Sequence, residues 1–215
     1  MRRFVLAVLA LSMVAGCKLH HELASVVGFE GEIEMSMGGG TQIMKIKGSK
    51  VRAESPAAPS AATITDIDAK KSWIVDHVAR SYTEVDLAAA SKTSSGAAPS
   101  SKTKAVKTGR SDAVAGQSCD VWNIEDASGA VIADVCVASG LHMMAMGLGG
   151  PFSAFSQGGD AWSVVYSHGF PLRMEMRDAK GAPMMKMEAT RIERKSIPDA
   201  EFQIPAGYTK LAWPI

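Results

Sequence analysis

The sequence predicts a mainly β protein with a few short helices, folded as a single domain. The first observation is a period of two: from Phe29 to Met37, apolar or small residues alternate with three glutamates and a serine, as in a strand with one buried face. The second is a pair of similar turns, Asp126-Ala-Ser-Gly129 and Asp178-Ala-Lys-Gly181, each between two apolar runs. Aspartate first and glycine fourth is the preference of a type I turn, so each turn predicts a hairpin.

The start of the chain predicts export and a lipid anchor. Two arginines precede the apolar run Phe4–Val14, which is too short to span a bilayer and has the length of a signal-peptide core. The residues Val14-Ala-Gly-Cys17 resemble a bacterial lipobox. We therefore expect residues 1–16 to be a signal peptide, Cys17 to be lipidated, residues 17–27 to be a tether and residues 28–215 to be the domain. The alternative is an ordinary secretory signal with a chance cysteine.

Charge and composition exclude some partners. Of 23 basic residues, two leave with the signal peptide, which leaves 21 against 22 acidic residues and a net charge of about −1. Nothing in this balance favours nucleic acid as a partner. The expected partner is a membrane, through the lipid anchor, and the sequence indicates no particular protein partner.

The first half of the domain reads as a series of short strands. Met44 and Ile46 alternate with Lys45 and Lys47, so the basic face of this strand is expected beside the acidic face of the first one. The predicted strands are Phe29–Met37, Gln42–Lys47, Lys50–Glu54, Ala62–Asp68, Ser72–His77 and Ser81–Leu87. The predicted loops are Ser55–Ala62, which is rich in proline, alanine and serine, and residues 88–107, which are of low complexity.

Cys119 and Cys136 flank the first Asp-Gly turn. A four-residue loop at Asp126–Gly129 places Cys119 directly opposite Cys136, with Trp122 and Ile124 on the other, apolar face. An even pair of cysteines in an exported chain predicts a disulfide. Such a bridge contributes about 3 kcal/mol.

The second half predicts further strands and an irregular helical region. Leu141–Gln157 follows no strict period and is broken by glycines and a proline, so we expect two short helical pieces, or a helix and a loop, over one sheet face. Strands are expected at Ala161–Tyr166, Phe170–Arg177 and from Met184 to about Arg194. A four-residue loop after Arg177 places Met174 opposite Met185 and Leu172 opposite Met187.

Several motifs resemble a known family. They are Gly28-Phe-Glu-Gly31, Lys107-Thr-Gly109 before Gly116-Gln-Ser-Cys119, Gly169-Phe-Pro-Leu-Arg173 and Phe202-Gln-Ile-Pro-Ala-Gly-Tyr208. Together they resemble the exported domain-of-unknown-function family 4412, which is grouped with LolA/LolB-like lipoprotein carriers. The resemblance implies an antiparallel LolA-like half-barrel, open along one side, with a helical segment over the concave face. It supplies no functional residue.

Enzyme and metal signatures are not found in the sequence. It contains no Gly-x-Ser-x-Gly elbow, no His-Glu-x-x-His and no P-loop, so we expect no catalytic site, no cofactor and no enzyme activity. No histidine stands at zinc-ligand spacing from either cysteine of the hairpin. Copper(I) binding by His142-Met-Met-Ala-Met146 is a weaker alternative, based on the preference of copper(I) for thioether ligands.

Methionine is the unusual residue, and it leads to a hypothesis about function. Methionine side chains suit adaptable apolar surfaces, so we expect a concave cleft that binds an acyl chain or a similar apolar ligand. Its expected lining is Ile33, Met35, Met44, Ile46, Trp122, Ile124, Met143, Met146, Met174 and Met185. The alternative is a structural or interaction lipoprotein with a self-filled cavity. Lys18 follows the lipobox, and resemblance to enterobacterial sorting rules then implies the outer membrane, facing the periplasm.

Overall fold

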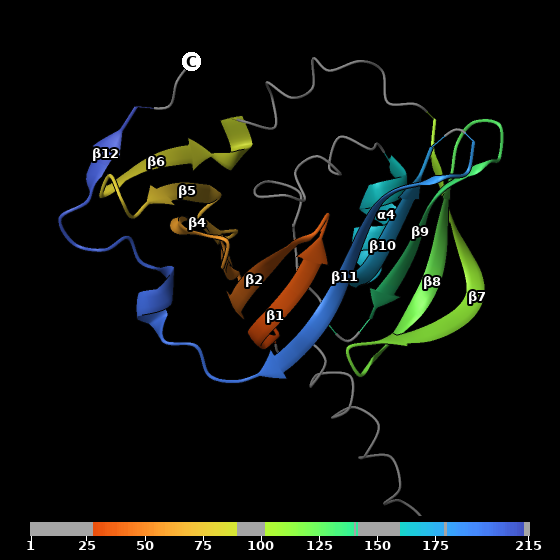
Figure 1. Cartoon of the computed structure of the whole chain (residues 1–215), viewed down its shortest axis with the longest axis horizontal. Helices are drawn as coiled ribbons and strands as arrows, with labels where there is room; N and C mark the ends of the chain where they lie inside the picture. The colour runs from red at the N-terminus through yellow and green to blue at the C-terminus, as the bar shows by residue number, and fades with distance from the viewer. Residues whose placement is uncertain (1–27, 90–101, 140, 142–159, 179, 213–215) are drawn as a thin grey trace, which may run out of the picture.

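A computed structural model describes residues 28–89, 102–139, 141, 160–178 and 180–212. Within these ranges, twelve strands form one sheet in the order β12-β6-β5-β4-β3-β2-β1-β11-β10-β9-β8-β7 (Figure 1). The predicted signal peptide, Cys17 and the tether lie outside the described residues. The same holds for Met143, Met146 and nearly all of Leu141–Gln157.

The elements follow the chain in this order: β1 (Glu30–Met37), β2 (Gly40–Lys47), β3 (Lys50–Ser55), β4 (Ala58–Asp66), β5 (Lys71–Asp76), β6 (Ser81–Asp86), β7 (Lys104–Val114), β8 (Gln117–Glu125), β9 (Val131–Ala138), α4 (Asp160–His168), β10 (Phe170–Arg177), β11 (Pro183–Arg194), the 3-10 helix η3 (Asp199–Phe202) and β12 (Thr209–Leu211). All paired strands are antiparallel except β12, which runs parallel to β6.

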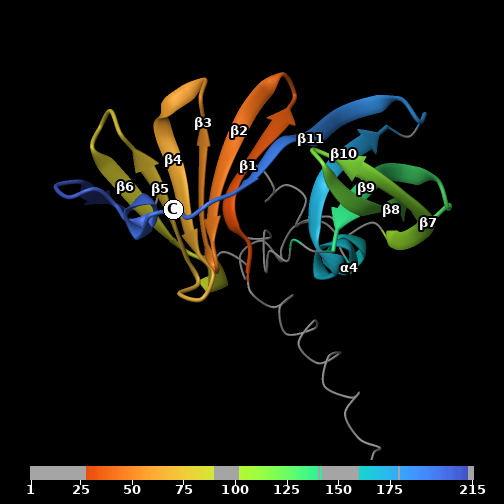
Figure 2. The same cartoon turned by 90° about the horizontal axis from the view of Figure 1, so that it is seen from below.

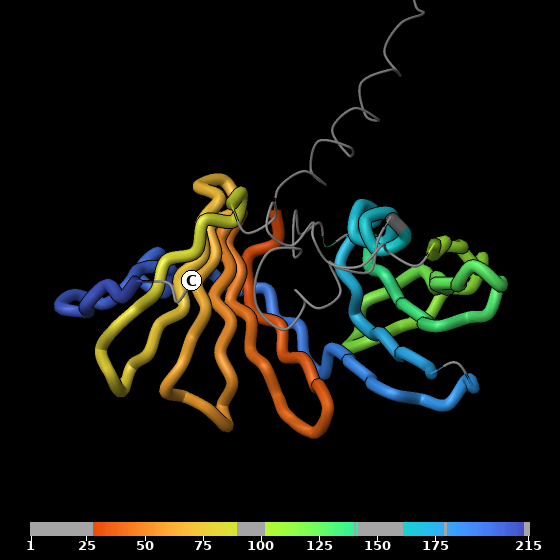
Figure 3. The backbone as a smooth tube through the Cα atoms, turned by 90° about the horizontal axis from the view of Figure 1, so that it is seen from above, coloured from red at the N-terminus to blue at the C-terminus, as the bar shows by residue number. Residues whose placement is uncertain are grey.

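The sheet is a curved half-barrel that stays open. Its two ends, β12 and β7, do not pair with each other, and the strands arch around one side with α4 inside the curve (Figure 2). β1 and β11 lie in the middle and join the two halves (Figure 3). The mainly β half-barrel predicted from the sequence is therefore confirmed.

β1 shows why these residues form strands. Ile33 and Met35 are fully buried, whereas the alternating glutamates are partly exposed. Ile33 lies opposite Met44 of β2 and Ile192 of β11, so the buried face continues across three strands. On the other face, Lys47 forms an ion pair with Glu30 at 3.7 Å, as the opposite charges of β1 and β2 predicted.

The β8–β9 hairpin has a different register from the predicted one. The N–H of Asp126 donates to the carbonyl of Ala130 (2.9 Å), and Gly129 has a φ of +85°, which makes a three-residue loop with a glycine bulge. A second irregularity next to Ile124 adds another residue. Val121, not Cys119, therefore lies opposite Cys136. Each one-residue shift would move the side chains to the other face, and two such shifts return them to the predicted face. The predicted apolar side of the hairpin is therefore correct although its register is not.

The β10–β11 hairpin repeats this error for the same reason. The N–H of Asp178 donates to the carbonyl of Ala182 (2.8 Å), and the register shifts again next to Met176. Met174 lies opposite Met187, and Met176 lies opposite Met185. The predicted partners, Met174 with Met185 and Leu172 with Met187, are therefore wrong by two residues, while the predicted faces are correct.

Three element predictions are wrong. Ala161–Tyr166 is helical within α4, where Ala161, Trp162 and Val165 are buried; short apolar runs do not separate helix from strand by periodicity. The Ser55–Ala62 loop is mostly strand, because β4 begins at Ala58 and a register shift in its pairing with β3 accommodates Pro59. The low-complexity loop is shorter than residues 88–107, because β7 begins at Lys104.

Two apolar clusters stabilise the sheet on opposite faces. The large cluster includes Ile33, Met44 and Met174 and extends from β1 and β2 to β9, β10 and α4. The small cluster joins Ile64 and Val75 to Ile197 and Phe202. These last two residues belong to the stretch between β11 and β12, which we name the closing segment. Ile64 lies opposite Arg52, and Arg52 lies opposite Lys45, whose side of β2 points away from Ile33. The closing segment, which packs on Ile64, therefore covers the outer face of the sheet. Salt bridges fix it there, including Lys45 to Glu201 at 3.0 Å and Lys47 to Asp199 at 2.9 Å.

Candidate functional site

Seven methionines share the inner face of four adjacent strands. Met37 of β1 lies opposite Met187 of β11, which in turn lies opposite Met174 of β10. Met185 and Met176 form the next pair of β11 and β10. We name this set the methionine face: Met35, Met37, Met44, Met174, Met176, Met185 and Met187. Side chains two residues apart in a strand share a face, so the alternation of each strand aligns its methionines with those of its neighbours.

Most of the predicted lining residues meet in one apolar cluster. Seven of them are at most 7% exposed, and Met185 is half-buried against the same cluster. The seven are Ile33, Met35, Met44, Ile46, Trp122, Ile124 and Met174. Met143 and Met146 lie outside the described residues. The structure thus brings eight of the ten predicted residues together.

Sequence reasoning missed Met37, Met176 and Met187 as members of this surface. Met187 is 1% exposed, and the other two pack against the cluster. Their alternation with charged residues was visible in the sequence. What was missing was the pairing of β1 with β11, which joins strands from opposite ends of the domain.

Helix α4 closes one end of the inner face. The ring centroids of His168 in α4 and Trp122 in β8 are 4.5 Å apart. Trp122 lies opposite Val135, and Val135 lies opposite Met174, so Trp122 is on the same side of the sheet as Met174. Trp162 and Val165 of the same helix are buried in the large cluster. The helix that covers the sheet in the described residues is therefore α4, which the sequence predicted as a strand.

Among the described residues, two of the buried side-chain oxygens without a hydrogen-bond partner belong to β2 and α4. They are Oε1 of Gln42 in β2 and the hydroxyl oxygen of Tyr166 in α4. Burial raises the pKa of the Tyr166 phenol to about 12, because desolvation disfavours the phenolate. The hydroxyl is therefore neutral at physiological pH and able to donate a hydrogen bond.

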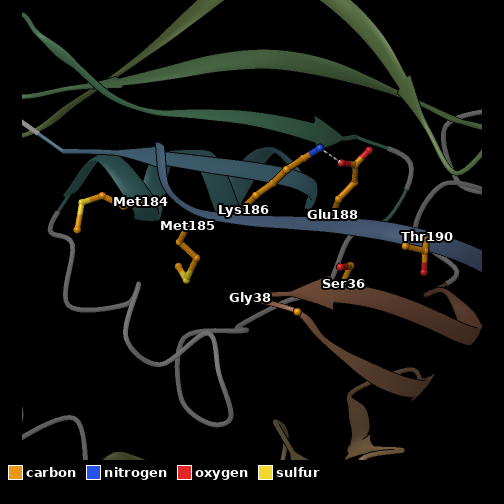
Figure 4. A pocket seen from close by; sticks show the side chains of 8 residues that line it. Ser36, Gly38, Met184, Met185, Lys186, Glu188 and Thr190 are labelled. Carbon is orange, nitrogen blue, oxygen red and sulfur yellow. Dashed lines mark ion pairs between the residues drawn. The ribbon is translucent and has the colours of Figure 1, made fainter. Parts of the chain in front are cut away.

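A pocket of about 420 Å³ lies beside the tip of the β1–β2 hairpin (Figure 4). Its lining consists of Ser36, Gly38, Gly39, Met184, Met185, Lys186, Glu188 and Thr190. Lys186 forms an ion pair with Glu188, and both alternate with the methionines of β11, so they lie on the opposite face of that strand. Of the ten residues predicted to line an apolar cleft, this pocket includes Met185 alone.

The two cysteines of the β8–β9 hairpin form the predicted disulfide. The Cα atoms of Cys119 and Cys136 are 5.3 Å apart, within the normal range for a bridge. Since Val121 is the partner of Cys136 in the ladder, the bridge runs diagonally across the two strands.

One family covers nearly the whole described domain. Residues 29–208 match the model of the family described as "Domain of unknown function (DUF4412)". The chain belongs to this family. No curated protein sequence matches the DUF4412 chain.

Solved structures resemble this DUF4412 domain distantly. An uncharacterized conserved protein from Thermus thermophilus matches with 9% identity and a TM-score of 0.49, over 91% of this chain and 96% of the other. A chain of the Pseudomonas aeruginosa MucA/MucB complex matches with 10% identity and a TM-score of 0.43, over 86% and 60%. A putative outer membrane lipoprotein-sorting protein domain from Vibrio parahaemolyticus matches with 9% identity and a TM-score of 0.37, over 86% and 94%. At TM-scores below 0.5, these likenesses carry no argument about function.

Further features of the DUF4412 domain bear on its chemistry. Among the residues that the structure describes, no three or more His, Cys, Asp or Glu side chains are grouped to hold a metal ion. His77, which follows β5, is engaged on both nitrogens: Nε2 lies 3.2 Å from an Arg52 nitrogen and Nδ1 lies 2.9 Å from the Tyr208 hydroxyl. In the same described ranges, no helix has the length and apolar character needed to cross a membrane.

Proposed function

We propose that this DUF4412 domain is a lipid-anchored binding protein of the bacterial envelope that holds an acyl chain or a similar apolar ligand and catalyses no reaction. The observation that carries the proposal is the methionine face, which extends over four neighbouring strands of an open sheet. Unbranched thioether side chains rearrange easily, so such a surface adapts to a flexible chain better than a surface of branched residues.

The anchor and the location rest on separate support. The lipobox ending at Cys17 favours attachment to a membrane by acyl chains, and stable attachment takes at least two of them. The disulfide between Cys119 and Cys136 favours an oxidising compartment such as the periplasm. Lys18 after the anchor supports the outer membrane, by resemblance to enterobacterial sorting.

The second candidate is an interaction lipoprotein whose apolar face is filled by its own side chains. The observation that favours it is burial: Ile33, Met35 and Ile124 are fully buried within the large cluster. In that case the methionine face is ordinary core, and the domain has no room for a guest.

Dye binding separates the two candidates. A soluble Cys17→Ala form is titrated with an apolar dye whose fluorescence rises in a dry environment. Met176→Gln and Met185→Gln change a half-buried pair on the methionine face and are expected to weaken dye binding. Met184→Gln is the matched control, because Met184 is the neighbour of Met185 on the opposite face and is 69% exposed.

The two outcomes have clear meanings. Weaker dye binding by the pair on the methionine face, with unchanged binding by the Met184→Gln control, supports the ligand-binding function. Equal binding by all variants, with folding checked by circular dichroism, leaves only the self-filled alternative. Native mass spectrometry of wild-type protein extracted from membranes gives a second test, since a bound lipid adds its mass to that of the lipidated chain.

The anchor has its own test. Cys17→Ala is expected to move the protein from the membrane fraction to the soluble fraction without loss of folding. A Cys17→Ala protein that stays in the membrane fraction, together with a wild type whose signal peptide is not removed, would contradict the lipoprotein assignment.

A further inference from the structure

Next to the methionines of the methionine face, β2 carries a polar side chain whose acceptor oxygen has no partner among the described residues. Gln42 of β2 lies directly opposite Met35 and two residues before Met44, on the same face of the strand. Its Oε1 atom is buried and has no hydrogen-bond partner among the described residues. Most buried polar atoms in folded proteins are paired, and an unpaired one destabilises the fold, so each exception needs a reason.

A second unused polar group lies on the helix that closes the same face. The hydroxyl of Tyr166 is also buried without a partner, and its ring packs near Trp162 with centroids 6.3 Å apart. α4 reaches the inner face through the contact of His168 with Trp122. An entirely hydrocarbon ligand on the methionine face would leave Oε1 of Gln42 without a partner, whereas a ligand with a polar hydrogen could donate to it.

We propose that the ligand of the methionine face is an acyl chain that carries a hydroxyl group, and that this hydroxyl donates to Oε1 of Gln42. This inference rests on the proposed function, since it names the class of ligand for the same face. It adds a specificity-determining residue that neither the sequence motifs nor the apolar cluster indicates.

The test compares two chains that differ by one hydroxyl. Tetradecanoic acid and 3-hydroxytetradecanoic acid are titrated separately into the soluble Cys17→Ala protein, and the ratio of their dissociation constants is measured. One neutral hydrogen bond predicts that the hydroxylated chain binds about 3- to 10-fold more tightly. Gln42→Met, which continues the methionine face, is expected to reduce this ratio to about 1.

Asn123 supplies the matched control. Its Oδ1 atom is buried and unpaired like that of Gln42, but it alternates with Trp122 and Ile124 along β8 and so lies on the opposite face. Asn123→Leu is expected to leave the ratio unchanged. Gln42→Leu provides a second apolar replacement, and thermal unfolding of all variants verifies that they fold.

The outcomes separate this inference from the proposed function. Equal affinity of the wild type for the two chains, or a ratio that persists in both Gln42 variants, overturns the role of Gln42 while leaving acyl-chain binding intact. Absence of binding by either chain overturns the proposed function itself. A ratio lost in the Gln42 variants and kept in Asn123→Leu supports the inference.

Discussion

Removing the disulfide is the perturbation whose cost follows most directly from the structure. Cys119 and Cys136 are 17 positions apart, and cross-linking a loop of that length lowers the chain entropy of the unfolded state by an amount worth about 3 kcal/mol. Both residues are at most 3% exposed, so alanine in their place also removes buried sulfur atoms, at about 1 kcal/mol each. We expect a loss of about 3 kcal/mol in reduced wild type and of about 5 kcal/mol in the double alanine variant.

Urea unfolding of the soluble Cys17→Ala form, followed by circular dichroism, measures both losses. With a slope of roughly 1–3 kcal/mol per molar urea, the loss of the cross-link shifts the midpoint by about 1–3 M. The reductant itself is controlled by the double alanine variant, whose midpoint must not respond to it. If reduction leaves the wild-type midpoint unchanged, the reasoning from loop entropy is refuted for this hairpin.

The remaining predictions concern backbone, packing and charge. Gly31→Ala is expected to cost about 2–4 kcal/mol of stability, because a Cβ there would lie 2.1 Å from the carbonyl oxygen of Glu193 and push β1 from β11. Gly39→Ala, also at positive φ but with open space around it, is expected to cost about 1 kcal/mol. Equal losses in the two variants would contradict the role of the close contact. Phe202→Ala is expected to cost about 3–5 kcal/mol, because Phe202 of the closing segment is buried against Ile64 and Val75. The exposed Gln203→Ala is expected to stay within about 0.5 kcal/mol, and a smaller loss at Phe202 would mean that the closing segment adds little stability. Hydrogen bonds from Lys71, Lys210 and Trp73 lower the pKa of Glu84 to about 2. The Glu84 carboxylate therefore stabilises the folded state above its ordinary pKa of 4.5, and this stabilisation is lost as the pH falls toward 2. Glu84→Gln should flatten the decline in melting temperature between pH 4.5 and 2, and identical declines in variant and wild type would argue against the lowered pKa.

Much of the candidate site was available from the sequence because alternation is a local property. An extended backbone sends successive side chains to opposite faces, so the inward direction of Met35, Met44 and Met174 follows from their own strands. The apolar side of the Cys119–Cys136 hairpin was correct for the same reason, even though its register was not.

The register itself depended on details that the turn motif does not contain. Asp126-Ala-Ser-Gly129 is compatible with a four-residue loop and with the observed three-residue loop that uses Gly129 at positive φ. The additional bulge next to Ile124 has no sequence signature of its own, because its position depends on the twist and packing of the neighbouring strands. Similarly, the apolar run in α4 fits a helix or a strand by its sequence. Ala161, Trp162 and Val165 are buried on one side of α4, and this pattern can be recognised as helical only when the surface they cover is known.

By itself, the sequence determined the class of fold, the strands of the first half apart from the start of β4, the faces of those strands and the cysteine pair. Only the tertiary structure decided which strands are neighbours. It brought β1 beside β11, where Thr190 donates to the carbonyl of Glu34 across 156 positions, and it set the closing segment against the outer face through Lys45 and Glu201. The physical reason is that alternation is fixed within a few residues of backbone, whereas strand order depends on the burial of distant apolar faces against one another, which local sequence does not encode.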